Sequence, residues 1–401
     1  MSLGQLGGAP GNHCHRSNAS MERNQMRESL FQDLFVLELA NNHWGKLDRG
    51  LKIIRDFGEV VRANHVRAAI KLQFRDIGSF IHKHHRERED VRYIKKVIAT
   101  EMPWESHQAM VEAIRAAGMV TMVTPFDEVS VDKCVEFDVE FLKIASSDIR
   151  DRILLDKIAG AGKPVIASTG GSAVGDIDDL VALFAERNIP FAINHCVSIY
   201  PSRDRELELN QIDFLRARYP DIVIGFSSHE MTDWISSVMI AYAKGARTFE
   251  RHIDIDYEDV PVAPYCTLPE QADQWFKAFH KAQEMSGSPG VAKRAPPDKE
   301  VRYLDELVRG VYVRRDLPVG HELTRDDVYF AVPLLHGQIS VREFTGGEAL
   351  RHPLFKDRPV RLRDLESAYS NNLVLQRMID DRGVAAIPGV AEPASKRVVG
   401  Q

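Results

Sequence analysis

Two short stretches place a histidine two positions after an oxygen-bearing side chain. In VIGFSSHE, residues 223–230, Ser227 precedes His229, and in RTFERHID, residues 247–254, Glu250 precedes His252. Side chains two apart share one face of a strand, so each pair points to one side. If the two strands are neighbours, both histidines meet at one rim, where imidazole and oxygen ligands suit a borderline divalent ion. The sequence therefore predicts a divalent-metal site at His229 and His252, the alternative being two core histidines with satisfied hydrogen bonds.

Two lysines end apolar stretches, Lys71 in AAIKLQ and Lys143 in FLKIASS. Two cations facing one cavity repel each other unless an anion lies between them. Hydroxyl groups that can donate to phosphate or carboxylate oxygens flank these lysines and the other apolar runs: Thr124, Ser146, Ser168 and Ser227. We expect a phosphorylated, carboxylated small molecule there, and the alternative is one structural lysine paired with a glutamate. Glu38 is a candidate base or an acceptor for a substrate hydroxyl.

Short apolar strands alternate with amphipathic helices from Leu34 onward. The strands are expected at 34–39, 68–73, 120–124, 139–144, 165–168, 191–196, 222–227 and 247–253, with helices that include 50–63, 104–117, 176–186, 231–244 and 269–285. Eight such units in roughly 250 residues predict an α/β fold, a (βα)8 TIM barrel, whose active site lies at the carboxyl ends of the strands. All eight expected strand ends carry polar side chains. A doubly wound open sheet is the alternative, but residues 41–45 lack the GxGxxG pattern of that fold.

Composition limits the classes of partner and compartment. The chain has 401 residues and a net charge of −6, which argues against nucleic acid and a polybasic membrane patch. The four cysteines form no CxxC pair, so a reduced, cytoplasmic protein is expected. No apolar run approaches the ~18 residues of a membrane span.

Composition also divides the chain into five parts. We expect a flexible N-terminal tail at 1–33, the barrel at 34–287, a Gly/Pro-rich linker at 288–300, a small β-rich domain at 301–366 and a C-terminal tail at 367–401. The small domain is expected to contain a strand at 308–313, and the last tail a helix near 373–379. The basic run at 82–86 is expected to be a solvated loop.

An ordered series of motifs resembles the sialic acid (N-acetylneuraminate) synthase family. ELANNHWG resembles the family's E-x-x-x-N-H-x-G opening, and IKLQ, TPFD, KIASSD, ASTGG, NHCVSIYP, GFSSHE and FERHID follow in its order. The resemblance covers about residues 34–287, and the module after the linker resembles the antifreeze-like SAF domain. Proteins described as spore-coat polysaccharide biosynthesis protein E are relatives of the same family.

The resemblance implies a synthase that condenses phosphoenolpyruvate with an open-chain aldose or N-acyl hexosamine, assisted by a divalent metal, often manganese. It implies that His229 and His252 hold the metal, with Glu38, Lys71 and Lys143 as catalytic residues. Substrate contacts are implied for Gln73, Thr124, Ser146, Ser168, Tyr200, Ser227 and Arg309. It further implies a domain-swapped homodimer in which Arg309 reaches the acyl group of the sugar in the partner's site.

Two departures concern the sugar half of the site. The family's P-G-P-D motif is replaced by residues 259–265, DVPVAPY, and its S-D-H by Ser227-Ser228-His229. Strand parity points Ser228 away from the cavity. The identity of the acceptor sugar is therefore left open. Two rival functions remain, a Schiff-base aldolase using Lys71 or Lys143, and a non-catalytic sugar-binding or assembly protein.

Overall fold

The structure is a computed structural model that describes residues 29–257, 260–288, 292–366 and 372–385. The chain divides into two compact units, Met1–Ser288 and Pro289–Gln401, and each is described by itself. No helix within these described ranges is both long and apolar enough to cross a membrane.

The first unit is a closed barrel of eight parallel strands in the order β1 to β8. The strands are β1 (Leu34–Ala40), β2 (Arg67–Phe74), β3 (Val120–Pro125), β4 (Phe141–Ile144), β5 (Val165–Ser168), β6 (Phe191–Cys196), β7 (Val223–Ser228) and β8 (Thr248–His252). The predicted (βα)8 TIM barrel is therefore confirmed, with β5 and β6 at the expected bounds. The fourth strand begins at Phe141 rather than at Val139, because Val139 is still part of the turn that leaves the preceding helix, where its N–H donates to Cys134 O.

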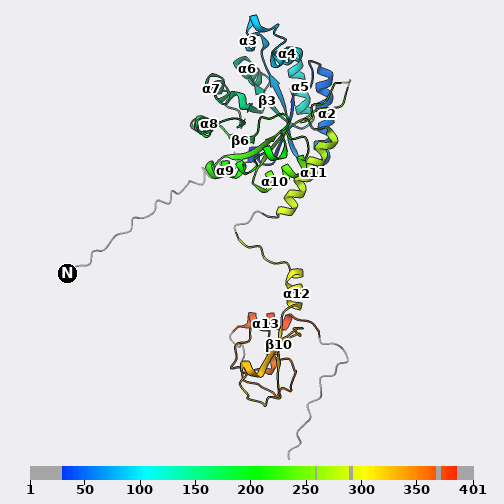
Figure 1. Cartoon of the computed structure of the whole chain (residues 1–401), viewed down its shortest axis with the longest axis vertical. Helices are drawn as coiled ribbons and strands as arrows, with labels where there is room; N and C mark the ends of the chain where they lie inside the picture. The colour runs from blue at the N-terminus through cyan, green and yellow to red at the C-terminus, as the bar shows by residue number, and fades with distance from the viewer. Residues whose placement is uncertain (1–28, 258–259, 289–291, 367–371, 386–401) are drawn as a thin grey trace, which may run out of the picture. The chain divides into compact units, whose positions relative to one another are not determined.

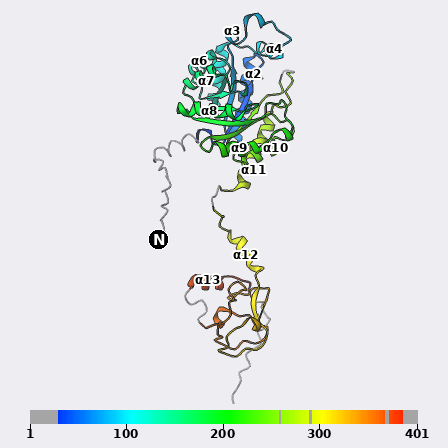
Figure 2. The ribbon, with the colours of Figure 1, turned by 60° about the vertical axis from the view of Figure 1, so that its left-hand side comes forward.

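Helices cover the outside of the barrel, except for two short ones after the second strand, which lie at one end of it (Figures 1 and 2). They are α2 (Leu47–Asn64), α3 (Ile77–Phe80), α4 (Arg92–Ala99), α5 (Trp104–Ala116), α6 (Glu128–Glu136), α7 (Arg152–Gly160), α8 (Val174–Glu186), α9 (Asn210–Arg218), α10 (Trp234–Ala243) and α11 (Pro269–Ser286). Helix α10 begins at Trp234, three residues later than expected, because the Asp233 side chain caps it by accepting from Ser236 N. The expected solvated loop at 82–86 is exposed.

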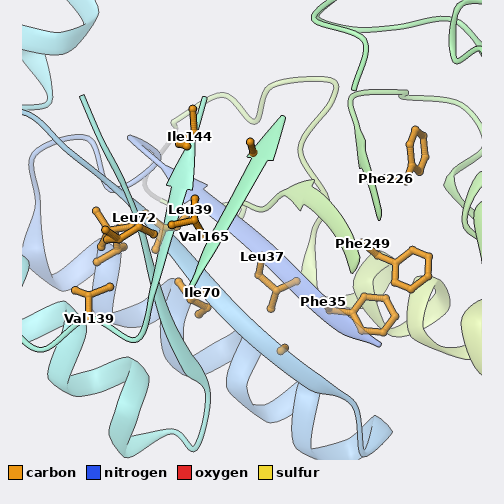
Figure 3. Close-up of a cluster of buried hydrophobic side chains, with 14 of the residues drawn as sticks. Phe35, Leu37, Leu39, Ile70, Leu72, Val139, Ile144, Val165, Phe226 and Phe249 are labelled. Carbon is orange, nitrogen blue, oxygen red and sulfur yellow. The ribbon is translucent and has the colours of Figure 1, made fainter. Parts of the chain in front are cut away.

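Alternate residues of each strand face these helices and form the main hydrophobic core. Figure 3 shows Phe35 of β1 beside Phe249 of β8, with ring centroids 5.3 Å apart. Phe35 also packs edge-on against Trp275, Phe276 and Phe279 of α11, which closes the barrel where its last helix meets its first strand.

The other residues of each strand face the barrel axis, and their character changes along it. At the amino ends they form a second apolar cluster, which includes Val36, Met122 and Ile166. Phe31 joins this cluster and is only 1 % exposed. The expectation of a flexible tail over 1–33 is therefore wrong for its last residues, because Phe31 seals the amino-terminal end of the barrel. Residues 1–28 lie outside the described part.

The second unit packs around its own small core. Helix α12 (Asp298–Glu306) precedes an antiparallel pair, β9 (Gly310–Val313) and β10 (Val328–Ala331), and helix α13 (Leu373–Asp381) follows (Figure 1). The expected linker at 288–300 thus gives way to helix at Asp298. The helix expected near 373–379 is confirmed as α13, but it is not part of a tail, because Ile379 is fully buried in the core with Val311 and Leu323. Residues 386–401 lie outside the described part.

Candidate active site

A cavity of about 760 Å³ lies at the carboxyl ends of the barrel strands. Eleven of the twelve residues singled out in the sequence line it: Glu38, Lys71, Gln73, Thr124, Lys143, Ser146, Ser168, Tyr200, Ser227, His229 and His252. The twelfth, Arg309, is exposed in the second unit. The inward face of each strand is thus apolar toward its amino end and polar toward its carboxyl end.

Glu250 of β8 lies between the two lysines. Its Oε1 is 2.7 Å from Nζ of Lys71, and its Oε2 is 3.4 Å from Nζ of Lys143. Burial alone would raise the pKa of Glu250, but the charges of Lys143 and Lys71 outweigh it and lower the pKa to about 2. Burial lowers the pKa of Lys71 to about 8, with Glu250 opposing the shift, so its ammonium keeps its proton at neutral pH. The anion expected between the lysines is therefore supplied by the protein itself.

Glu38 extends this network toward the mouth of the cavity. It pairs with Lys71, and β1 and β2 hold the two residues directly opposite each other. Its Oε1 accepts a hydrogen bond from Nε2 of Gln73 at 2.9 Å. Glu38, Lys71 and Gln73 therefore form one connected polar wall, and the lysine–glutamate pairing regarded as the alternative coexists with the cavity.

Hydroxyl groups surround the two lysines. Nζ of Lys143 donates to Oγ of Ser168 at 2.5 Å, and Ser146 accepts from the N–H of Gly170 at 3.0 Å. Thr124 is buried, and its Oγ1 has no hydrogen-bond partner among the described residues. A buried hydroxyl without a partner is uncommon and marks a place where a ligand oxygen can bind.

The two histidines stand together on neighbouring strands, as their sequence spacing predicts. The rings of His229 and His252 have centroids 5.4 Å apart. Tyr200 covers them, with its ring centroid 4.0 Å from that of His229. Burial lowers the pKa of His229 to about 4 and holds the pKa of His252 well below its ordinary value, so both rings are neutral at physiological pH.

Their chemistry fits a divalent cation. Nδ1 of His229 lies 3.0 Å from Val197 O, so this nitrogen donates and Nε2 keeps its lone pair. A backbone carbonyl that fixes the tautomer in this way is typical of metal-ligating histidines. No group of three or more His, Cys, Asp or Glu side chains that could enclose an ion is present in the described ranges. The two imidazoles thus fit an ion that keeps coordination positions for water or substrate.

Gly225 of β7 has no side chain, and this leaves space for Asn194 to reach Glu250. Nδ2 of Asn194 lies 3.4 Å from Glu250 Oε2, and Oδ1 of Asn194 accepts from Oγ1 of Thr248 at 2.5 Å. A Cβ at Gly225 would lie 2.6 Å from the Thr248 carbonyl oxygen and closer still to Asn194 Oδ1. Only glycine fits there, and it is what allows Asn194 to reach Glu250.

Two polar residues near the strand ends face away from the cavity. Ser228 accepts from Nη1 of Arg251 at 3.0 Å on the helix side of the barrel, as strand parity predicts. His195 stacks on Phe226, and its Nε2 lies 2.7 Å from Leu207 O. Both support the barrel wall.

Among the other residues that line the cavity, five with polar or charged side chains carry no assignment from the sequence: Arg75, Tyr93, Lys96, Asp148 and Tyr265. Arg75 follows Gln73 by two positions, so strand parity indicates that it faces inward. Asp148 ends the motif KIASSD. Tyr265 belongs to the altered 259–265 stretch, and its ring centroid lies 5.1 Å from that of His252. Tyr93 and Lys96 come from α4, and no sequence signal ties that helix to the site. Residue 259 lies outside the described part.

Two models of known protein families match the chain. The model of the NeuB family matches residues 61–289, more than half of the chain. The chain belongs to the NeuB family. A second model, that of the SAF domain, matches residues 308–366, so the expected small β-rich SAF domain is confirmed.

The individual relatives agree with this family. The Bacillus subtilis spore coat polysaccharide biosynthesis protein SpsE is 30% identical over 255 residues, covering 62% of this chain and 67% of that protein. The mouse N-acetylneuraminate-9-phosphate synthase is 24% identical over 294 residues, covering 73% and 80%. A crystal structure of a Chromobacterium violaceum protein, described as a spore coat polysaccharide biosynthesis protein E, superposes with a TM-score of 0.78 at 36% identity, covering 84% and 100%.

Proposed function

We propose that this protein is a synthase that condenses phosphoenolpyruvate with an open-chain aldose or N-acyl hexosamine, giving a nonulosonic, sialic-acid-like acid and phosphate. The observation that carries the proposal is the pairing of two buried lysines and their hydroxyl neighbours with two neutral histidines around one cavity. Membership of the NeuB family supports it, because one relative is an N-acetylneuraminate-9-phosphate synthase.

Phosphoenolpyruvate binds at the floor of the cavity in this proposal. Lys71 and Lys143 supply positive charge to its phosphate and carboxylate, and Glu250 pairs with both lysines. Hydroxyl donors complete the site: Thr124, Ser146, Ser168 and Ser227. The unpartnered Oγ1 of Thr124 supports an oxygen ligand at this level.

The acceptor lies nearer the rim, between the histidines and the Glu38–Gln73 wall. His229 and His252 would hold a divalent ion, which we propose is manganese and which would supply Lewis-acid polarisation of the acceptor aldehyde. Carbon 3 of phosphoenolpyruvate then attacks that aldehyde carbon, water adds at carbon 2, and phosphate leaves. Glu38, which pairs with Lys71, accepts the proton from the water. Gln73 and Tyr200 orient the sugar hydroxyls.

A homodimer in which the second unit of one copy serves the cavity of the other is part of the proposal. Arg309, exposed in that unit, is the residue proposed to meet the acyl group of the sugar. Co-expression of Arg309→Ala with His252→Ala tests this. Mixed dimers regain activity that neither variant has alone, whereas chains that act singly regain none.

The decisive assay uses purified full-length chain, Mn²⁺, phosphoenolpyruvate and a panel of aldoses and N-acyl hexosamines. Phosphate release that requires an acceptor supports the synthase. Absence of release with every acceptor favours a binding protein. A substrate adduct trapped on Lys71 or Lys143 by borohydride favours a Schiff-base aldolase, which needs a neutral lysine.

A further inference from the structure

The outer end of the cavity carries a guanidinium whose hydrogen bonds go to neutral acceptors. Arg75 donates to Gln73 Oε1 at 2.8 Å, to the Tyr93 hydroxyl at 3.2 Å and to Asn41 Oδ1 at 3.5 Å. Arg75 forms no ion pair with any described residue, although Asp127 and Asp148 act on it from a longer distance. No described carboxylate therefore occupies the position beside the guanidinium where a ligand anion can bind.

Aromatic rings hold this guanidinium in place. Its carbon Cζ lies 3.7 Å from the ring centroid of Phe126 and 5.7 Å from that of Tyr93. Stacking of this kind fixes the plane of the guanidinium, and the three hydrogen bonds above leave one N–H on each of Nη1 and Nη2 for an oxyanion. The arginine is thus preorganised at the cavity wall.

A second cation belongs to the same cavity. Lys96 lines the same cavity, is half-buried, and forms no side-chain hydrogen bond or ion pair within the described ranges. It lies three residues after Tyr93 on α4, and residues three apart are neighbours on a helix surface. Because Tyr93 contacts Arg75, α4 brings Lys96 toward the same end of the cavity. The adjacent Lys95 is exposed and lies 3.6 Å from Glu89 instead.

The charge balance differs between the two ends of the cavity. At the floor, two lysines meet two glutamates, Glu38 and Glu250. At the outer end, neither Arg75 nor Lys96 forms an ion pair with any described residue. Asp127 and Asp148 act on Arg75, and Asp254 on Lys96, only from beyond ion-pair distance. Charged donors without an ion-pair partner therefore remain at the outer end.

The spacing of residues along β2 and directly after it relates the floor of the cavity to its outer end. Lys71, Gln73 and Arg75 are two residues apart and face the same side, so Arg75 lies about 13 Å along the strand direction from Lys71. Gln73 bridges them, since it donates to Glu38 and accepts from Arg75. A sugar held at Gln73 has phosphoenolpyruvate below it and Arg75 above it.

We propose that Arg75 and Lys96 form an anion subsite that binds a phosphate or carboxylate group at the end of the acceptor sugar remote from its aldehyde. This inference rests on the proposed function, because it assigns the acceptor's chemical class. The acceptor is then an anionic sugar. Its aldehyde end would meet the divalent ion proposed at His229 and His252, and its anionic end would meet Arg75 and Lys96.

Matched acceptors test the subsite. Phosphate release is measured with N-acyl hexosamines, their 6-phosphates and the corresponding hexuronic acids, with wild type, Arg75→Gln, Lys96→Gln and the control Lys95→Gln. Wild type and the control are expected to prefer an anionic acceptor at least tenfold in kcat/KM. Arg75→Gln and Lys96→Gln lose at least tenfold on that acceptor only, with KM for phosphoenolpyruvate unchanged. Preference for the 6-phosphate alone identifies a phosphate subsite, and preference for the uronic acid alone a carboxylate subsite.

Two outcomes overturn the inference. One is equal use of neutral and anionic acceptors by wild type, and the other is an anionic preference that survives both substitutions. If no acceptor gives turnover, the proposed function fails, and calorimetric titration of the same 6-phosphates and uronic acids decides the subsite independently. Tight binding that is lost in Arg75→Gln and Lys96→Gln but kept in Lys95→Gln supports it, whereas equal binding by all four proteins contradicts it.

Discussion

The carboxylate of Glu250 lies 2.7 Å from the ammonium of Lys71, and its other oxygen approaches Lys143. Replacement by glutamine keeps the volume but leaves two buried ammonium groups without their shared counter-charge. Removal of one partner from a buried ion pair destabilises a protein by about 3–5 kcal/mol. We expect Glu250→Gln to lose about that much free energy of unfolding, measured by urea denaturation, together with most activity. Lys281→Gln, which breaks an exposed pair with Glu284, is the control and leaves the midpoint unchanged. An unchanged midpoint in Glu250→Gln contradicts the network.

Metal binding at the two histidines has a readout apart from turnover. A ligand that binds only the folded state raises the melting temperature. Mn²⁺ is expected to raise the melting temperature of wild type and to leave those of His229→Ala and His252→Ala unchanged, both variants also losing metal-dependent activity. His195→Gln is the matched control, since His195 faces away from the cavity, and it keeps the metal-induced shift. A full shift in either alanine variant argues against this assignment.

The bare position at Gly225 predicts a severe effect from one methyl group. In Gly225→Ala the new Cβ meets Asn194 and Thr248, so Asn194 is displaced from beneath Glu250. Overpacking of this kind destabilises by roughly 1–3 kcal/mol. We expect that loss in thermal unfolding together with reduced turnover. Gly175→Ala, where a Cβ meets no atom within 4 Å, is the matched control and keeps wild-type stability and activity. Equal behaviour of the two variants rules out the close approach.

The buried histidines His43 and His107 predict a loss of stability in mild acid. Burial lowers the pKa of His43 to about 3 and that of His107 to about 4, from an ordinary value of 6.5. Because the folded pKa is depressed, their contribution is fully present above pH 6.5. It falls as the pH drops toward 4 for His107 and toward 3 for His43, by about 1.4 kcal/mol per pH unit for each histidine.

The variant His107→Phe removes the pH-dependent contribution of His107 alone. Its Nδ1 has no partner among the described residues, and its ring packs on Phe74 and Trp104, so phenylalanine is a suitable replacement. Denaturant unfolding between pH 4.5 and 7.5 is expected to show a shallower pH slope for the variant, by about 1.4 kcal/mol per pH unit below pH 6. Identical slopes for variant and wild type would exclude the buried neutral histidine.

Much of the barrel and of the candidate site followed from periodicity and strand parity. Parity placed Ser227 beside His229 and turned Ser228 outward, and both hold because parallel strands buried on two faces tolerate no shift of register. Lys71, Lys143 and the hydroxyls reach one cavity for the same reason. The expected tail failed at Phe31, whose burial depends on the barrel end that it closes and not on its own polar neighbours.

Other features depend on contacts that a single sequence does not reveal. The shared role of Glu250 requires two lysines from β2 and β4 to reach a carboxylate of β8 inside the barrel, which only barrel closure brings about. Lys96 reaches the cavity from a helix inserted after β2, and no spacing rule links that helix to the strand ends. Arg75 did carry a signal, since it continues the inward face of Lys71 and Gln73.

The apolar layer that closes the amino-terminal end of the barrel gives the cavity a gradient in dielectric response. Met122 of this layer is in register with Phe141, two residues before Lys143 on β4, while Tyr93 at the outer end is 50% exposed. Coulomb energy at a fixed separation grows as the surroundings become less polarisable. Neutralising Lys143, which is 2 % exposed, therefore changes anion binding more than the same change at half-buried Lys96. The effect of each cation on anion binding therefore depends on its depth in the cavity as well as on its charge.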